Sequence, residues 1–234
     1  MTEPALSIAL FDPTQGLHVS ARAGTTLLFE QGGARVLDDG PYFQREGDGW
    51  SVELEGSLAL RFEPVAEPAP LGPLTAHLCS VEGEAAGRHV SCLGTVGETD
   101  GSLEWRELDA LRSVSAIFDS DHALLALARR PRGAPGHGSE LVSAWLLAGG
   151  KAVPVEEARI STVYDGDGRQ RSAGLELWID GEDFPRRCSG AVAAGSSLAL
   201  DGLDVHAAVF RWRMEGRDGA GAYELWARAR SEAA

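Results

Sequence analysis

Residues 109–147 read DALRSVSAIFDSDHALLALARRPRGAPGHGSELVSAWLL, and this stretch decides the fold. Two apolar runs flank a short polar turn, a loop rich in proline and glycine follows, and a third apolar run ends the stretch. Short apolar runs bounded by turn residues are typical of β-strands. We therefore expect three consecutive antiparallel strands here.

The same pattern continues on both sides of this stretch. Glycine and aspartate recur roughly every eight to twelve residues, between runs whose apolar period is close to two. Residues 46–49 (EGDG) and 165–168 (DGDG) are typical hairpin turns. The sequence therefore predicts an all-β protein, an antiparallel meander that forms one or more β-barrels, or two packed β units, because closure removes unpaired strand edges.

Two predictions concern the organisation of the chain. Residues 64–73 (PVAEPAPLGP) are rich in proline, which resists interior positions of a sheet. This segment is the expected connector between an N-terminal β unit (1–63) and a C-terminal β unit (74–234). Residues 111–118 and 123–128 are apolar on both faces, so either a second β unit or a partner subunit in a homodimer should cover them.

Composition excludes several classes of partner. The 234 residues carry a formal net charge of -14, which repels phosphate backbones and anionic lipids, so we expect no nucleic-acid and no membrane partner. The N-terminal sequence lacks a signal peptide, and a cytoplasmic location is the expectation. No glycine-rich nucleotide-binding motif is present, and we expect no cofactor.

The three cysteines, Cys79, Cys92 and Cys188, do not have the spacing of metal ligands, so no metal site is expected. Cys79 and Cys92 could form a disulfide if their strands are adjacent. The alternative is that all three are buried free thiols.

The C-terminal half resembles the lipocalin-like carotenoid hydratase/AttH superfamily. The resemblance is carried by the strand-turn-strand at 116–128, the run STVYDGDGRQRSAGLELW at 161–178, and the closing RWRMEGRDGAGAYELW at 211–226. In the last segment a Gly-x-Gly (Gly219, Gly221) leads to an aromatic-Glu pair (Tyr223, Glu224). The resemblance extends from residue 105 to the end. It implies paired β-barrel-like halves, a terpenoid or polyketide ligand and, in enzymatic members, hydration or cyclisation without an organic cofactor.

The loop at 130–140 contains the densest set of titratable groups. His137 is flanked by glycines, and Glu140 could orient its imidazole or act as an acid itself. Arg112 lies in a largely apolar strand and must reach water or a carboxylate. Its candidate partners are Glu224, Glu176 and Glu140, and it could instead stabilise negative charge on a ligand. His137, Glu140 and Arg112 are therefore the predicted catalytic residues, with a solvated loop histidine and a structural ion pair as the alternative.

The alternating set from His206 to Met214 predicts one internal face with aromatic walls. Residues that could line a ligand cavity, with ordinary core packing as the alternative, are Trp145, Trp178, His206, Phe210, Trp212 and Tyr223.

Three hypotheses follow from these patterns. The protein could hold a hydrophobic small molecule in a β-barrel cavity. It could be a cofactor-free acid–base enzyme, namely a hydratase, isomerase or cyclase, on the same scaffold. It could also be a structural or partner-binding domain with a filled core.

Overall fold

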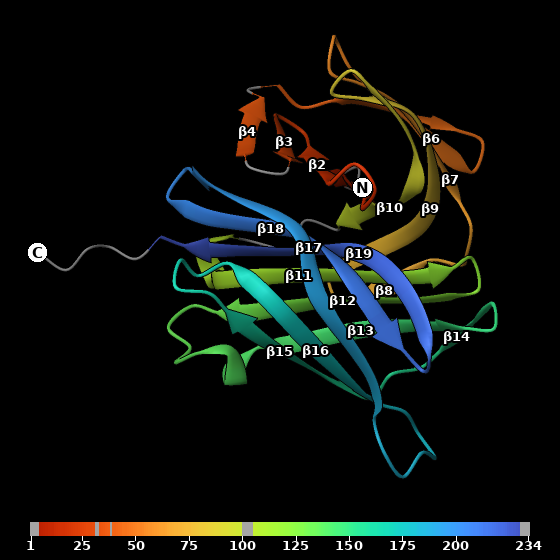
Figure 1. Ribbon diagram of the computed structural model, residues 1–234, viewed down its shortest axis with the longest axis vertical. Coiled ribbons are helices and arrows are strands. Elements are labelled where there is room, and N and C mark those ends of the chain that lie inside the picture. Colours follow the sequence, from red (N-terminus) through yellow and green to blue (C-terminus); the bar gives the residue numbers. More distant parts are fainter. Residues whose placement is uncertain (1–4, 31–32, 38, 100–104, 230–234) are drawn as a thin grey trace, which may run out of the picture.

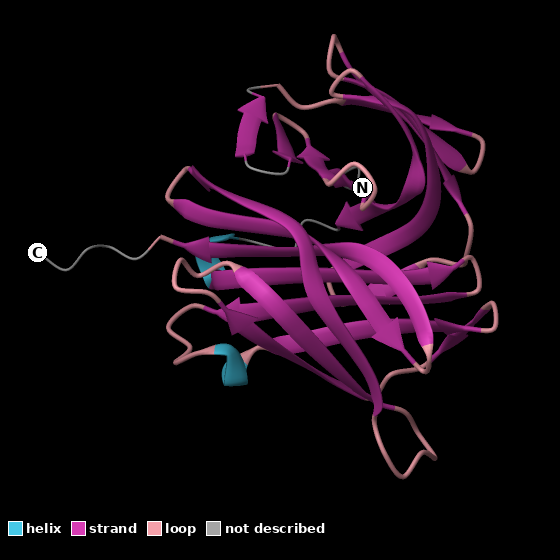
Figure 2. Cartoon of the chain, in the orientation of Figure 1, coloured by secondary structure: helices cyan, strands magenta, loops and turns pink. Residues whose placement is uncertain are grey.

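The computed structural model describes residues 5–30, 33–37, 39–99 and 105–229, and most of them lie in antiparallel strands (Figures 1 and 2). The first sheet contains β1 (Ala5–Asp12), β2 (Leu17–Arg22), β3 (Thr25–Glu30), β4 (Gly33–Leu37), β5 (Tyr42–Glu46), β6 (Gly49–Leu54), β7 (Leu58–Pro64), β8 (Ala69–Leu71), β9 (Leu74–Ala85) and β10 (Arg88–Thr99). The second contains β11 (Leu108–Asp119), β12 (His122–Pro131), β13 (Leu141–Ala148), β14 (Lys151–Val153), β15 (Glu157–Tyr164), β16 (Gln170–Trp178), β17 (Arg186–Leu200), β18 (Leu203–Met214) and β19 (Arg217–Arg228). Two 3-10 turns are also present, η1 (Trp105–Glu107) and η2 (His137–Ser139).

The two sheets repeat one strand order. The first runs β4-β3-β2-β1-β10-β9-β7-β6-β5, with β8 paired to β9, and the second runs β14-β13-β12-β11-β19-β18-β17-β16-β15. In each unit the first strand pairs with the last, through Ile8 opposite Val96 and Ser113 opposite Glu224. The prediction of an all-β, antiparallel, lipocalin-like fold is confirmed, as two curled sheets rather than one barrel (Figure 1).

The change of sheet does not fall at the proline-rich segment. Residues 64–73 include β8, which pairs with β9 inside the first sheet through Pro70 opposite Thr75. A short strand that pairs on one side only tolerates proline, because a backbone N–H on its other side would have no partner strand. The chain instead passes from one sheet to the other after Thr99 and before Leu108.

Three layers of apolar side chains follow from the alternation along the strands. One core lies inside the first unit around Trp50 and Phe62, and one lies inside the second around Phe210 and Trp212. A third layer lies between the units, where Leu71 and Leu78 of the first sheet meet residues of the second; these are Ile117, Ala123, Leu125, Leu127, Trp145, Leu147, Val209 and Ala222. The first unit therefore covers the outer faces of β11 and β12, which is one of the two alternatives expected for these strands.

The cysteines are free thiols, and burial raises the pKa of Cys79, Cys92 and Cys188 to about 12. Cys79 and Cys92 lie on the adjacent strands β9 and β10 but are not opposite each other, since Cys79 pairs with Gly94. Within the described ranges, no helix is both long enough and apolar enough to cross a bilayer.

Candidate functional site in the C-terminal unit

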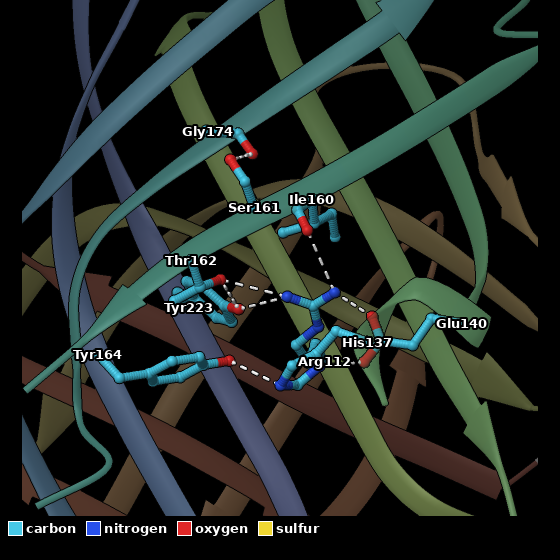
Figure 3. A network of polar contacts seen from close by, with 9 residues as sticks. All are labelled: Arg112, His137, Glu140, Ile160, Ser161, Thr162, Tyr164, Gly174 and Tyr223. Atoms are coloured by element: carbon cyan, nitrogen blue, oxygen red, sulfur yellow. Dashed lines mark hydrogen bonds and ion pairs between the residues drawn. The ribbon is translucent and has the colours of Figure 1, made fainter. Parts of the chain in front are cut away.

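The η2 turn places the predicted histidine and glutamate side by side. His137 opens the turn and Glu140 follows it, with the Glu140 N–H donating to the His137 carbonyl. Residues three apart on a helical turn lie on the same side. The His137 Nδ1 atom accordingly lies 2.6 Å from Glu140 Oε1 (Figure 3).

Glu140 also forms a buried ion pair with Arg112. Arg112 Nη2 contacts Glu140 Oε2, and the two side chains are 2% and 1% exposed. Of the three carboxylates considered from the sequence, the structure selects Glu140. Burial alone would lower the pKa of Arg112, but Tyr223 and Glu140 outweigh it and raise that pKa, so the guanidinium remains charged.

Most of the other N–H groups of Arg112 also form hydrogen bonds. Arg112 Nη1 donates to the hydroxyl oxygens of Tyr223 (3.1 Å) and Thr162 (3.2 Å), and Nη2 donates to the carbonyl of Ile160 (3.4 Å). Tyr223 and Thr162 are themselves 2.7 Å apart, and burial raises the pKa of Tyr223 despite the opposing charge of Arg112. Of the Arg112 donor groups, the Nε–H alone is buried without a hydrogen-bond partner among the described residues.

His137 is the accessible member of this network. Its side chain is 41% exposed, its ring stacks on Tyr164, and its Nε2 lies 3.4 Å from the Tyr164 hydroxyl (Figure 3). A buried carboxylate thus orients an imidazole whose second nitrogen remains near the surface. This arrangement can transfer protons, because one ring nitrogen is held by a carboxylate while the other stays accessible to accept or donate a proton.

A pocket of about 890 Å³ adjoins the network. Arg112, His137 and Glu140 line one part of it. The other lining residues include apolar side chains and charged groups of the neighbouring strands, such as Ala158, Ile160, Leu175, Glu157, Glu176 and Arg187.

The six residues predicted as ligand-binding do not line this pocket. Phe210 and Trp212 stack 5.0 Å apart inside the second unit's core, and Tyr223 binds Arg112. The predicted internal face is present, but side chains fill the space in front of it. Phe210, Trp212 and Tyr223 pack in the core of the second unit, which is the alternative expected for them from the sequence.

The other three predicted residues have different surroundings. Trp145 is buried between the two units. Trp178 packs under the guanidinium of Arg159, whose Cζ is 4.8 Å from the ring. His206 Nδ1 is 2.6 Å from the Ser197 hydroxyl.

Sequence reasoning missed Thr162 and Tyr164. Both belong to β15, where Ala158 and Ile160 are buried and the outward residues between them are exposed. Extending this period of two would have placed Thr162 and Tyr164 on the inner face. Their role as partners of Arg112 and His137 depends on contacts between distant strands, which the local pattern does not contain.

These observations define a class of protein, two lipocalin-like β units with an ionised polar network beside a pocket in the second. No family model and no curated protein matches the sequence. Among solved structures, kievitone hydratase from Nectria haematococca superimposes with a TM-score of 0.60 at 9% identity, covering 97% of this chain and 90% of that one.

A Nitrosomonas europaea protein provisionally described as AttH superimposes with a TM-score of 0.54 at 14% identity, covering 94% of this chain and 90% of that one. At these identities the likeness shows a shared fold. It confirms the paired β-barrel-like halves that the sequence resemblance implied, and it extends over nearly the whole chain rather than from residue 105 onward.

Proposed function

We propose that this protein binds an apolar small molecule, of terpenoid or polyketide type, in the pocket beside His137. The observation that carries the proposal is the pocket itself, whose volume of about 890 Å³ lies within the usual range for small-molecule sites. Its lining combines apolar side chains such as Ile160 and Leu175 with the polar groups of His137 and Glu140. The fold shared with kievitone hydratase supports a hydratase-like scaffold.

Acid–base catalysis is the second candidate function, and the 2.6 Å contact between His137 and Glu140 favours it. In a hydration, the imidazolium of His137 would donate a proton to one carbon of a double bond, water would add to the other carbon, and His137 would recover the proton that the water loses. Glu140 would orient the ring. Because Arg112 already donates to Glu140, Tyr223, Thr162 and the Ile160 carbonyl, its role would be to hold Glu140 in position.

Native mass spectrometry of the protein purified from its own host tests binding. We expect an apolar metabolite to co-purify with the wild-type protein, and less of it to co-purify with His137→Trp, whose larger ring would occupy part of the pocket. The matched control is His89→Trp, because His89 is an exposed histidine near a carboxylate in the first unit. Metabolite bound equally by all three proteins would place the ligand elsewhere.

The same metabolite separates binding from catalysis. His137→Asn keeps a polar side chain but cannot act as an acid or base near neutral pH. Retained binding with turnover reduced by about a hundredfold or more would indicate an enzyme. If the wild-type protein binds the metabolite but does not convert it, the protein has a binding function and no catalytic one.

A further inference from the structure

A second polar cluster lies between the two units. Along β2, Leu17, Val19 and Ala21 face the core of the first unit, so His18, Ser20 and Arg22 point the other way. Glu224 and Trp226 of β19 meet them from the second unit. Polar side chains on an otherwise apolar interface must be paired, or they destabilise it.

Glu224 and His18 form a closed pair. His18 Nε2 lies 2.5 Å from Glu224 Oε1, while His18 Nδ1 lies 2.7 Å from the Leu10 carbonyl oxygen. Both ring nitrogens therefore lie within hydrogen-bond distance of an oxygen atom. Trp226 Nε1 and Ser20 Oγ donate to Glu224 Oε2 at 2.7 and 3.4 Å. Burial opposes the charge of Glu224, but these hydrogen bonds outweigh it and lower the pKa of the carboxyl group.

Arg22 is the second basic residue of this cluster. Its Cζ lies 4.4 Å from the centroid of the Trp226 ring. Burial lowers the pKa of Arg22, and the charge of Glu224 only partly compensates. In the part of the chain that the structure describes, no carboxylate lies within ion-pair distance of its guanidinium. Glu224 contacts His18 directly, so the Arg22 guanidinium is the cation of this cluster that can pair with a further anion.

This cation lines a cavity between the units. The cavity has a volume of about 330 Å³, and Arg22, Ser20 and Glu224 lie in its wall. The rest of its lining is mostly apolar and includes Ile8, Leu27, Leu74, Trp105, Leu111 and Leu127. It shares no lining residue with the pocket beside His137.

We propose that the cavity between the units is a binding site for a small carboxylic acid with an apolar body. The carboxylate would accept two parallel hydrogen bonds from the Arg22 guanidinium, a pairing that arginine geometry favours. The apolar body would lie against Leu27, Leu74 and Leu127. The volume is at the lower end of the range for small-molecule sites, which limits the body to a short chain or a single ring system.

Isothermal titration calorimetry of the full chain with octanoate, octan-1-ol and octylamine tests this proposal. We expect octanoate to bind more tightly than the alcohol and the amine, which have the same chain without the anion. Arg22→Gln should weaken octanoate binding by about tenfold to a hundredfold, and Arg22→Lys by less. Arg171→Gln is the matched control, since Arg171 is an exposed arginine on β16 and should not matter.

Two outcomes would overturn the proposal. One is equal binding of octanoate and octan-1-ol by the wild-type protein, which needs no variant and therefore does not depend on whether Arg22→Gln folds. The other is octanoate binding that survives both Arg22→Gln and Thr25→Trp, because Thr25 lines the same cavity opposite Arg22 in the β2–β3 hairpin.

The test is independent of the proposed function. His137→Trp should leave octanoate binding unchanged, because His137 belongs to the other pocket. If His137→Trp abolishes octanoate binding and Arg22→Gln does not, the acid binds in the pocket beside His137, and the proposed site between the units is rejected.

Discussion

Glu140 and Glu224 are two buried carboxylates, and each lies near one imidazole and one guanidinium. The two sites differ in which of these groups is enclosed and which is accessible. At Glu140 the guanidinium of Arg112 is enclosed and the imidazole of His137 is accessible. At Glu224 the imidazole of His18 is enclosed, and the guanidinium of Arg22 lines a cavity. A ligand beside Glu140 would therefore meet a group that exchanges protons, whereas one beside Glu224 would meet a permanent charge.

The largest expected effect on stability is that of Glu140→Gln. This change leaves Arg112 buried without its anion, and a guanidinium does not lose its proton in a protein. Breaking a buried ion pair in this way costs about 3–5 kcal/mol of unfolding free energy, measurable by urea titration. Glu157→Gln, at an exposed partner of Arg159, should change stability by less than about 1 kcal/mol. A comparably small loss in Glu140→Gln would mean that Arg112 reaches water.

Glu224→Gln should cost less, about 1.5–3 kcal/mol, in the same titration. The reason is that a histidine side chain has a neutral form that a buried site tolerates, whereas a guanidinium keeps its charge. A loss equal to or larger than that of Glu140→Gln would contradict the distinction between the two sites.

Acid should abolish the difference between Glu224→Gln and the wild type. The pKa of Glu224 is lowered below its ordinary value of 4.5, so the unfolded chain binds this proton more readily than the folded chain. The stabilisation is then fully present above pH 4.5 and is lost as the pH falls through the folded-state pKa. Urea titrations of both proteins at a series of pH values should converge on acidification. A constant difference down to the acid transition would show that the charge of Glu224 does not contribute.

The smallest effect is expected for His137→Ala. Its ring is 41% exposed, and Glu140 keeps Arg112 as a partner when the ring is removed. We expect a loss of about 1 kcal/mol or less. Thermal unfolding followed by circular dichroism would check this, and a loss close to that of Glu140→Gln would show that the histidine is part of the structural ion pair.

Local sequence patterns predicted which residues form strands and which face inward, but not what lies opposite the inner face. The alternation from His206 to Met214 correctly placed Ala208, Phe210, Trp212 and Met214 on an inner face, and all four are buried there. It could not show whether that face meets a void or other side chains, because this depends on which distant strands lie opposite. The ligand-binding role of these side chains therefore stays a prediction.

The predicted site was partly accessible to sequence reasoning. His137 and Glu140 are three residues apart, so one local turn brings them together. The pairing of Arg112 with Glu140 was one of three possibilities, and only the tertiary structure selects it. Arg22 was not predicted as a site residue, although the alternation of LHVSAR at Leu17–Arg22 indicates a polar face opposite an apolar one.

The pairing of β11 with β19 has a consequence for how the chain folds during synthesis. Arg112 and Tyr223 are in hydrogen-bond contact although 111 positions separate them in the chain. During synthesis, the backbone groups on one edge of β11 therefore remain unpaired until β19 has been made. Such long-range pairing slows folding and exposes the nascent sheet to association with other chains. The first unit, complete by then through β10, can already shield the outer face of β11 during this interval, so the order of the two units along the chain protects the later one.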